Sequence, residues 1–121
     1  MADIAVAPSG LFTKDLNLEN PGASEDDPSI QLDEAAVISK LRAVLRGTTP
    51  SVTWTLRHGS DRNAAGTEVV TGGTTTTNTT TGETITSFNS ASIPAGDHVW
   101  LETTAASGTV LSFRVTIVFN G

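Results

Sequence analysis

Two histidines, His58 and His98, are the side chains of this sequence best suited to proton transfer or metal binding near neutral pH. A zinc site would require cysteines or further histidines at ligand spacing, and the chain has no cysteine. A hydrolytic site would require a nucleophile and an orienting acid, and no motif in the sequence brings such a pair together. We therefore expect both histidines to be amphipathic surface residues at strand ends. We predict no enzyme activity, no catalytic residue, no metal ligand and no cofactor.

Clustered carboxylates and aromatic rings are the other groups that could form a binding site, for a cation or for a sugar. Glu25, Asp26 and Asp27 could hold a hard cation, but they lack the spaced carboxylates and the glycine of a calcium loop, so we interpret them as a solvated charge run. Trp54 and Trp100 could stack on a sugar ring or lie at a subunit interface. Each lies in an alternating segment, which favours a core or interface position.

Threonine dominates the part of the chain that must position these groups. Nineteen of the twenty threonines lie between Thr48 and Thr116, and a β-branched hydroxyl residue suits a pleated surface that faces water. Short alternating segments are separated by Gly-bearing turns, as in sandwiches and barrels. We predict an all-β fold, a small antiparallel β-sandwich or barrel-like domain over residues 31–121, with an extended acidic N-terminal arm over residues 1–30.

The clearest strands alternate apolar and polar residues. Residues 110–119 and 51–58 each place an apolar set on one face, and residues 98–104 follow a Pro-Ala-Gly-Asp turn. We expect residues 98–104 to form a hairpin with residues 110–119. The predicted shared core consists of Trp54, Leu56, Leu101, Phe113, Val115 and Ile117.

Residues 33–46 fit either a helix or a strand. Apolar residues recur there at helical spacing and Gly47 would suit a helix C-cap, yet Leu41, Ala43 and Leu45 also alternate with polar neighbours. We favour a strand, because a short turn over residues 47–50 would join it directly to the strand at residues 51–58.

The densest threonine tract spans residues 74–81. It is uncharged and rich in β-propensity, so an unpaired edge strand here would be prone to aggregation. Two alternatives stay open, a loop tip or a strand paired within the sheet or across subunits.

Charge separates the N-terminal arm from the rest of the chain. Residues 1–34 contain eight acids and one base, whereas the remainder is nearly neutral. The arm is either a solvated leader or a segment that orders on a neighbouring subunit through Leu11, Phe12, Leu16 and Leu18. Its charge disfavours nucleic acid and anionic membranes as partners. Without a secretory signal pattern or an apolar run near the roughly 20 residues of a membrane span, we expect folding in a cytoplasm.

The chain has an N-terminal arm that contains several prolines, no cysteine, and a small β-body rich in threonine and glycine. The segments of this body most similar to virion proteins are residues 41–47 (LRAVLRG), 52–62 (VTWTLRHGSDR) and 93–102 (IPAGDHVWLE). In these features the chain resembles the head decoration, or cement, proteins of tailed bacteriophages. The resemblance implies a homo-oligomer on the outer capsid surface that stabilises contacts between major capsid subunits, with no catalytic residue. An alternative is a tail-fibre or other appendage module that binds a host glycan through Trp54, Trp100 or residues 61–63.

Overall fold

All regular structure in the computed structural model, which describes residues 10–121, is β. The predicted all-β fold is therefore confirmed, and no helix that could cross a membrane occurs in this range. The strands form one antiparallel sheet. They are β1 (Leu11–Glu19), β2 (Ser29–Gln31), β3 (Ala36–Gly59), β4 (Thr67–Glu68), β5 (Thr74–Thr76), β6 (Glu83–Ile85), β7 (Ser92–Ile93) and β8 (His98–Asn120).

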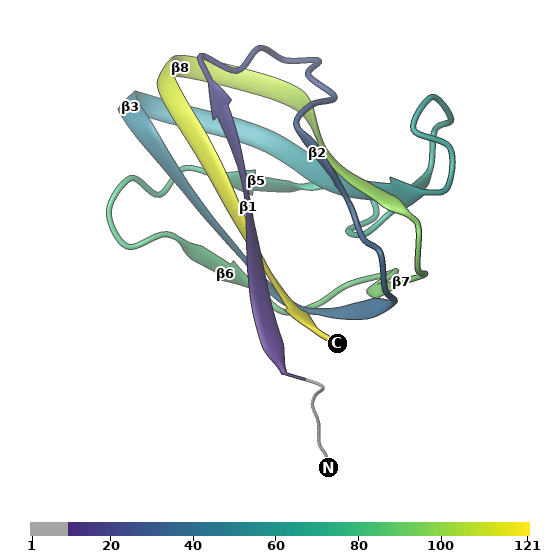
Figure 1. Ribbon diagram of the computed structural model, residues 1–121. Helices are drawn as coiled ribbons and strands as arrows, with labels where there is room; N and C mark the ends of the chain where they lie inside the picture. The colour runs from purple at the N-terminus through teal and green to yellow at the C-terminus, as the bar shows by residue number, and fades with distance from the viewer. Residues whose placement is uncertain (1–9) are drawn as a thin grey trace.

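Two long strands, β3 and β8, form the centre of the sheet and pair from Val37 opposite Asn120 to Gly59 opposite His98. β1 and β2 add to the free edge of β8, and β4 to β7 add to β3. Figure 1 shows that β3 and β8 curve together, so that the sheet folds back on itself. The first half contains residues 36–48 and 109–120 with β1, β6 and β7; the second contains residues 51–59 and 98–107 with β2, β4 and β5.

The fold line of the sheet lies where β3 and β8 both bend. A Cβ atom on Gly47 would lie 1.9 Å from the carbonyl oxygen of Thr109, and one on Gly108 would lie 2.1 Å from that of Thr49. The two backbones can approach this closely only without side chains. Pro50 has no amide hydrogen to donate, and the register shifts between Thr48 and Ser51.

These bends correct two sequence predictions. The turn expected at residues 47–50 and the hairpin expected at residues 106–108 are both wrong, because the chain does not reverse at either place. The two bends lie side by side, and pairing resumes beyond them with Ser51 opposite Ser107. Each pair of predicted strands is thus one continuous strand. The preference for a strand over a helix at residues 33–46 is confirmed from Ala36 onward.

The core fills the space between the two halves of the sheet. All six predicted core residues are fully buried, and the rings of Trp54 and Phe113 meet edge to face at 5.5 Å. The indole Nε1 of Trp54 donates to the hydroxyl of Thr76 at 2.9 Å, which satisfies its buried N–H group. On β8 the alternation fails at Leu111, which is 47% exposed because the register shift leaves it without an opposite residue on β3.

The described part of the acidic arm belongs to the same sheet as the body. β1 is extended, as predicted, but it pairs with β8 over its whole length and buries Leu16 in the core. The following loop is fixed by Thr103, whose hydroxyl donates to the carbonyl of Gly22 and accepts from the amide of Glu25. A domain boundary near residue 30 therefore does not divide the described chain, and residues 1–9 of the predicted arm lie outside the described range.

The threonine tract combines both alternatives left open by its sequence. Residues 74–76 form β5, which pairs with β3. Residues 77–81 form a loop organised by Asn78, whose side-chain oxygen accepts hydrogen bonds from the amides of Thr80, Thr81 and Gly82. Pairing to β3 removes one edge from exposure, and the Asn78 cap satisfies the loop backbone.

Candidate functional site

The outer surface of the first half-sheet carries a cluster of positive charge. Along β3, Leu41, Ala43 and Leu45 point into the core, so the residues that alternate with them point outward. Register places the Arg114 position of β8 opposite Val44, on this outer side. We call this surface the basic face; its cations are Lys40, Arg42, Arg46 and Arg114, four of the seven in the chain.

Polar residues of β1 border the basic face. The Nε atom of Arg114 donates to the side-chain oxygen of Asn17 at 3.0 Å, and the hydroxyl of Thr116 donates to Asp15 at 2.6 Å. Arg46 and Arg114, together with Glu19, line a shallow hollow of about 330 Å³. The guanidinium groups are thus spaced around a surface depression.

The other arginines are engaged within the molecule. Arg57 contacts Glu102 at 2.8 Å and Glu68 at 3.8 Å, and Arg62 contacts Asp27 at 3.2 Å. Within residues 10–121, no carboxylate lies within the 4.0 Å salt-bridge distance of a basic-face cation. The cations of the basic face therefore differ from Arg57 and Arg62, which serve local packing.

Most of the negative charge lies away from the basic face, which only Asp15 and Glu19 of β1 border among residues 10–121. Ten of the acids in residues 10–121 fall outside this face and its β1 border, against three bases. Five of these acids flank β2, namely Glu25, Asp26, Asp27, Asp33 and Glu34. A chain with net charge −6 therefore presents one surface of the opposite sign.

Neither tryptophan offers a platform for a sugar. Trp54 is fully buried in the core, and Trp100 is 2% exposed beneath the loop that follows β3. The guanidinium carbon of Arg62 lies 4.5 Å from the Trp100 ring centre, and a Cβ on Gly66 would approach that ring to 2.6 Å. Stacking on an external ligand is excluded in this conformation, because this loop already covers the ring. The core interpretation of Trp54 is confirmed.

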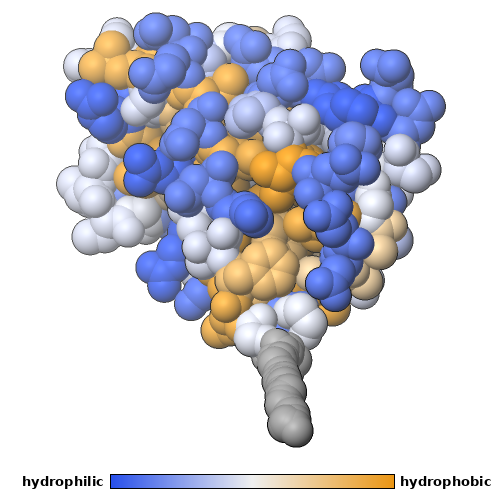
Figure 2. Space-filling model, viewed as in Figure 1, coloured by the Kyte–Doolittle hydropathy of each residue, from blue (hydrophilic) through white to orange (hydrophobic). Residues whose placement is uncertain are grey.

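The four apolar residues proposed as arm anchors have divided roles. Leu16 is buried and Leu18 packs against the core, so neither is available to a partner. Leu11 is 67% exposed, and Phe12 is 37% exposed while stacking on Phe119 at 5.1 Å. Figure 2 shows apolar surface near the start of β1, where these two residues lie.

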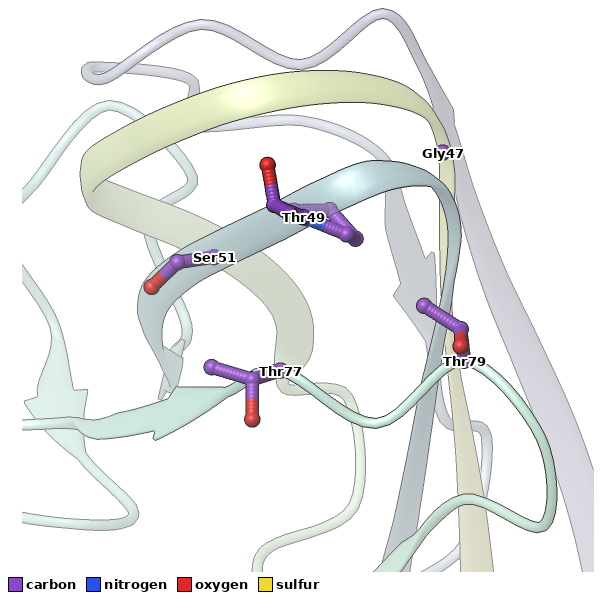
Figure 3. Close-up of a pocket in the computed structure, with 6 residues that line it drawn as sticks. Gly47, Thr49, Ser51, Thr77 and Thr79 are labelled. Carbon is purple, nitrogen blue, oxygen red and sulfur yellow. The ribbon is translucent and has the colours of Figure 1, made fainter.

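A second hollow, of about 370 Å³, lies beside the bend of β3 and is bordered by the loop at residues 77–81. Its lining is uncharged and consists of Gly47, Thr49, Pro50, Ser51, Thr77 and Thr79. Figure 3 shows that the hydroxyls of its labelled residues point in different directions, not toward one point. This arrangement supplies neither an acid–base pair nor a converging set of ligands.

His58 corrects the prediction of a surface histidine. Its Nδ1 atom lies 3.0 Å from Oδ2 of Asp97 and its Nε2 atom lies 2.9 Å from Oγ of Ser90, and the residue is 7% exposed. The sequence contained one signal for this position, since the inward alternation of Val52, Trp54 and Leu56 continues to His58. The partners are 32 and 39 residues away, so no local motif reveals them. His98 begins β8 and is half-buried.

Among residues 10–121 no cluster of three or more His, Cys, Asp or Glu side chains could hold a metal ion. Comparison of the chain with protein-family models, curated proteins and solved structures found no match.

Proposed function

We propose that this chain is a structural virion protein that binds the outer surface of a bacteriophage capsid and stabilises contacts between major capsid subunits. The observation that carries the proposal is the basic face, because it concentrates positive charge on one side of an acidic molecule. The binding partner of the basic face is an acidic surface of the major capsid protein. The resemblance to decoration proteins supplies the identity of that partner.

Arginine is well suited to this role. A guanidinium group is planar and can bind a carboxylate through two parallel hydrogen bonds, and three of the four basic-face cations are arginines. Exposed ion pairs each contribute only about 0.2–1 kcal/mol. The basic face therefore gives orientation and fast association, while neighbouring side chains must supply the buried contact area.

Apolar contact area is present near the start of β1. Leu11 and Phe12 are the exposed members of the predicted anchor set, and we place them at the contact with a neighbouring subunit, either another copy of this chain or the capsid protein. β1 also has one edge without a paired strand among the described residues. These features support a homo-oligomer assembled on the capsid, with the virion surface as its location.

The test compares two single charge reversals on capsids that lack this protein. Arg42→Glu changes the basic face, whereas Lys14→Glu makes the same charge change on β1 at a position that faces the opposite side of the sheet. We expect Lys14→Glu to lose much less binding than Arg42→Glu, because Lys14 lies outside the basic face. Arg42→Glu replaces an attraction with a repulsion and should bind roughly three- to tenfold more weakly, and added salt should weaken the wild-type complex.

Equal occupancy of the Arg42→Glu and wild-type proteins would overturn the assignment of the basic face. Binding of the wild-type protein to host cells but not to capsids would instead favour the appendage module. That alternative has no exposed tryptophan among the described residues to support it.

A further inference from the structure

The contacts of His58 resemble those of the histidine in a serine hydrolase, in which one ring nitrogen faces a serine hydroxyl and the other a carboxylate. We propose that Ser90 is a nucleophile that accepts acyl groups from activated esters, with His58 as its general base and Asp97 as a positioning residue. This activity is independent of capsid attachment, since Ser90 and Asp97 lie on loops of the chain that contribute nothing to the basic face.

The hydrogen bonds fix the roles of the two ring nitrogens. An ionised carboxylate can only accept a hydrogen bond, so Nδ1 of His58 carries the proton shared with Asp97. In a neutral ring this leaves Nε2 as an acceptor directed at the Ser90 hydroxyl. The serine proton therefore points at the group that must remove it.

Each member of this chain of hydrogen bonds is held by backbone contacts. The amides of Asn89 and Ser90 both donate to the carbonyl of Val69, and the Asp97 backbone bonds to Leu32 and Pro94. His58 lies near the end of β3, opposite Val99. Such fixation keeps the nucleophile and base in one geometry without rearrangement.

The three residues also differ in their exposure to solvent. His58 and Asp97 are each 7% exposed, whereas Ser90 is only partly buried. Burial strengthens the attraction between the Asp97 carboxylate and the His58 ring when the ring takes up a proton, since charges interact more strongly away from water. The partial exposure of Ser90 leaves a route for a small reagent.

The reaction balances with water as the second reactant. Oγ of Ser90 forms a bond to the acyl carbon, its proton passes to Nε2, and the bond from that carbon to the aryl oxygen breaks. The aryl oxygen leaves with the proton. Water then attacks the acyl carbon while Nε2 of His58 takes one of its protons. The bond to Oγ breaks, Oγ receives that proton from Nε2, and a carboxylic acid departs. No oxidation or reduction occurs in either step.

The substrate class follows from the hydrogen bonds that the backbone amides next to the Ser90 hydroxyl already make. Because the Asn89 and Ser90 amides donate to Val69, they are not free to stabilise an oxyanion. Loss of one such donor costs about 10²–10³ in rate in established hydrolases. We therefore confine the proposal to esters with a good leaving group, such as small aryl acetates, and to phosphonylating reagents that mimic the acylation step.

The experiment treats the full-length protein with a fluorophosphonate, which forms an Oγ–phosphorus bond and releases fluoride, and locates the label by peptide mass spectrometry. We expect the label at Ser90 and not at Ser87 or Ser92, which lie in the same part of the chain. Hydrolysis of p-nitrophenyl acetate should fall to the buffer rate in Ser90→Ala and stay unchanged in Ser87→Ala. His58→Gln should lower the rate by roughly a hundredfold.

Asp97→Asn should also slow the labelling, and Asp97→Glu should recover part of the rate, which a purely structural loss would not do. Circular dichroism and thermal melting identify any variant that fails to fold. Labelling of the wild-type protein needs no variant, so it tests Ser90 even where a variant fails to fold. An unlabelled wild-type protein, or equal labelling of Ser87 and Ser90, would overturn it.

Discussion

Two side chains, His58 and Trp54, make buried polar contacts that the composition of the chain does not predict. His58 joins β3 to the Ser90 and Asp97 loops, and Trp54 bonds to Thr76 across the second half-sheet. The inward position of His58 follows from alternation along β3, so that part was predictable from sequence. Its partners were not, because only the tertiary fold brings residues 32 and 39 positions away to the ring.

The two histidines should respond differently to the same substitution. His58→Gln leaves Ser90 and Asp97 without their partner in a buried setting, which should lower the free energy of unfolding by about 1–3 kcal/mol. His98→Gln is the matched control and should stay within about 0.5 kcal/mol of wild type. Urea unfolding at constant pH measures both. Equal stability of the two variants would mean that the His58 contacts contribute nothing to folding.

Strands β3 and β8 show what local patterns can and cannot predict. Alternation located their segments and the core face correctly, since period two depends on neighbours in sequence. The same patterns divided each strand in two, because Gly47-Thr48-Thr49-Pro50 and Ala106-Ser107-Gly108 are equally compatible with a reversal or a bend. Bends at adjacent positions on paired strands let the ladder continue, and that coincidence depends on contacts between distant residues. For the same reason the sequence does not reveal that residues 11–19 pair with β8 and bury Leu16 in the core.

Gly108 should tolerate a side chain much less well than Gly72. Both have positive φ, at 72° and 80°, but a Cβ on Gly108 meets the Thr49 carbonyl at 2.1 Å while one on Gly72 meets nothing within 4 Å. Gly72→Ala should cost about 1 kcal/mol from backbone strain alone. Gly108→Ala should cost at least about 2 kcal/mol more, because two backbones must separate. Thermal melts of the two variants measure the difference, and equal melting temperatures would contradict the close approach at the bend.

At the scale of the whole molecule, charge is segregated by the fold. Along the sequence, negative charge is concentrated in residues 1–34 and the rest of the chain is nearly neutral. Pairing of β3 with β8 then gathers Lys40, Arg42, Arg46 and Arg114 on one surface, because outward positions on both strands share a face. The basic face was therefore not predicted, since it requires the register as well as the strands. An acidic molecule with one basic surface binds a partner in a defined orientation.

The orientation on the capsid is the most direct test of this account. Electron cryomicroscopy of capsids that lack the protein, after its addition, would show which surface of the β-domain meets the major capsid protein. We predict that Arg42, Arg46 and Arg114 lie against acidic side chains of the capsid, with the acidic loops around β2 turned away. A bound domain whose basic face points into solvent, with the opposite surface against the capsid, would contradict the proposed attachment.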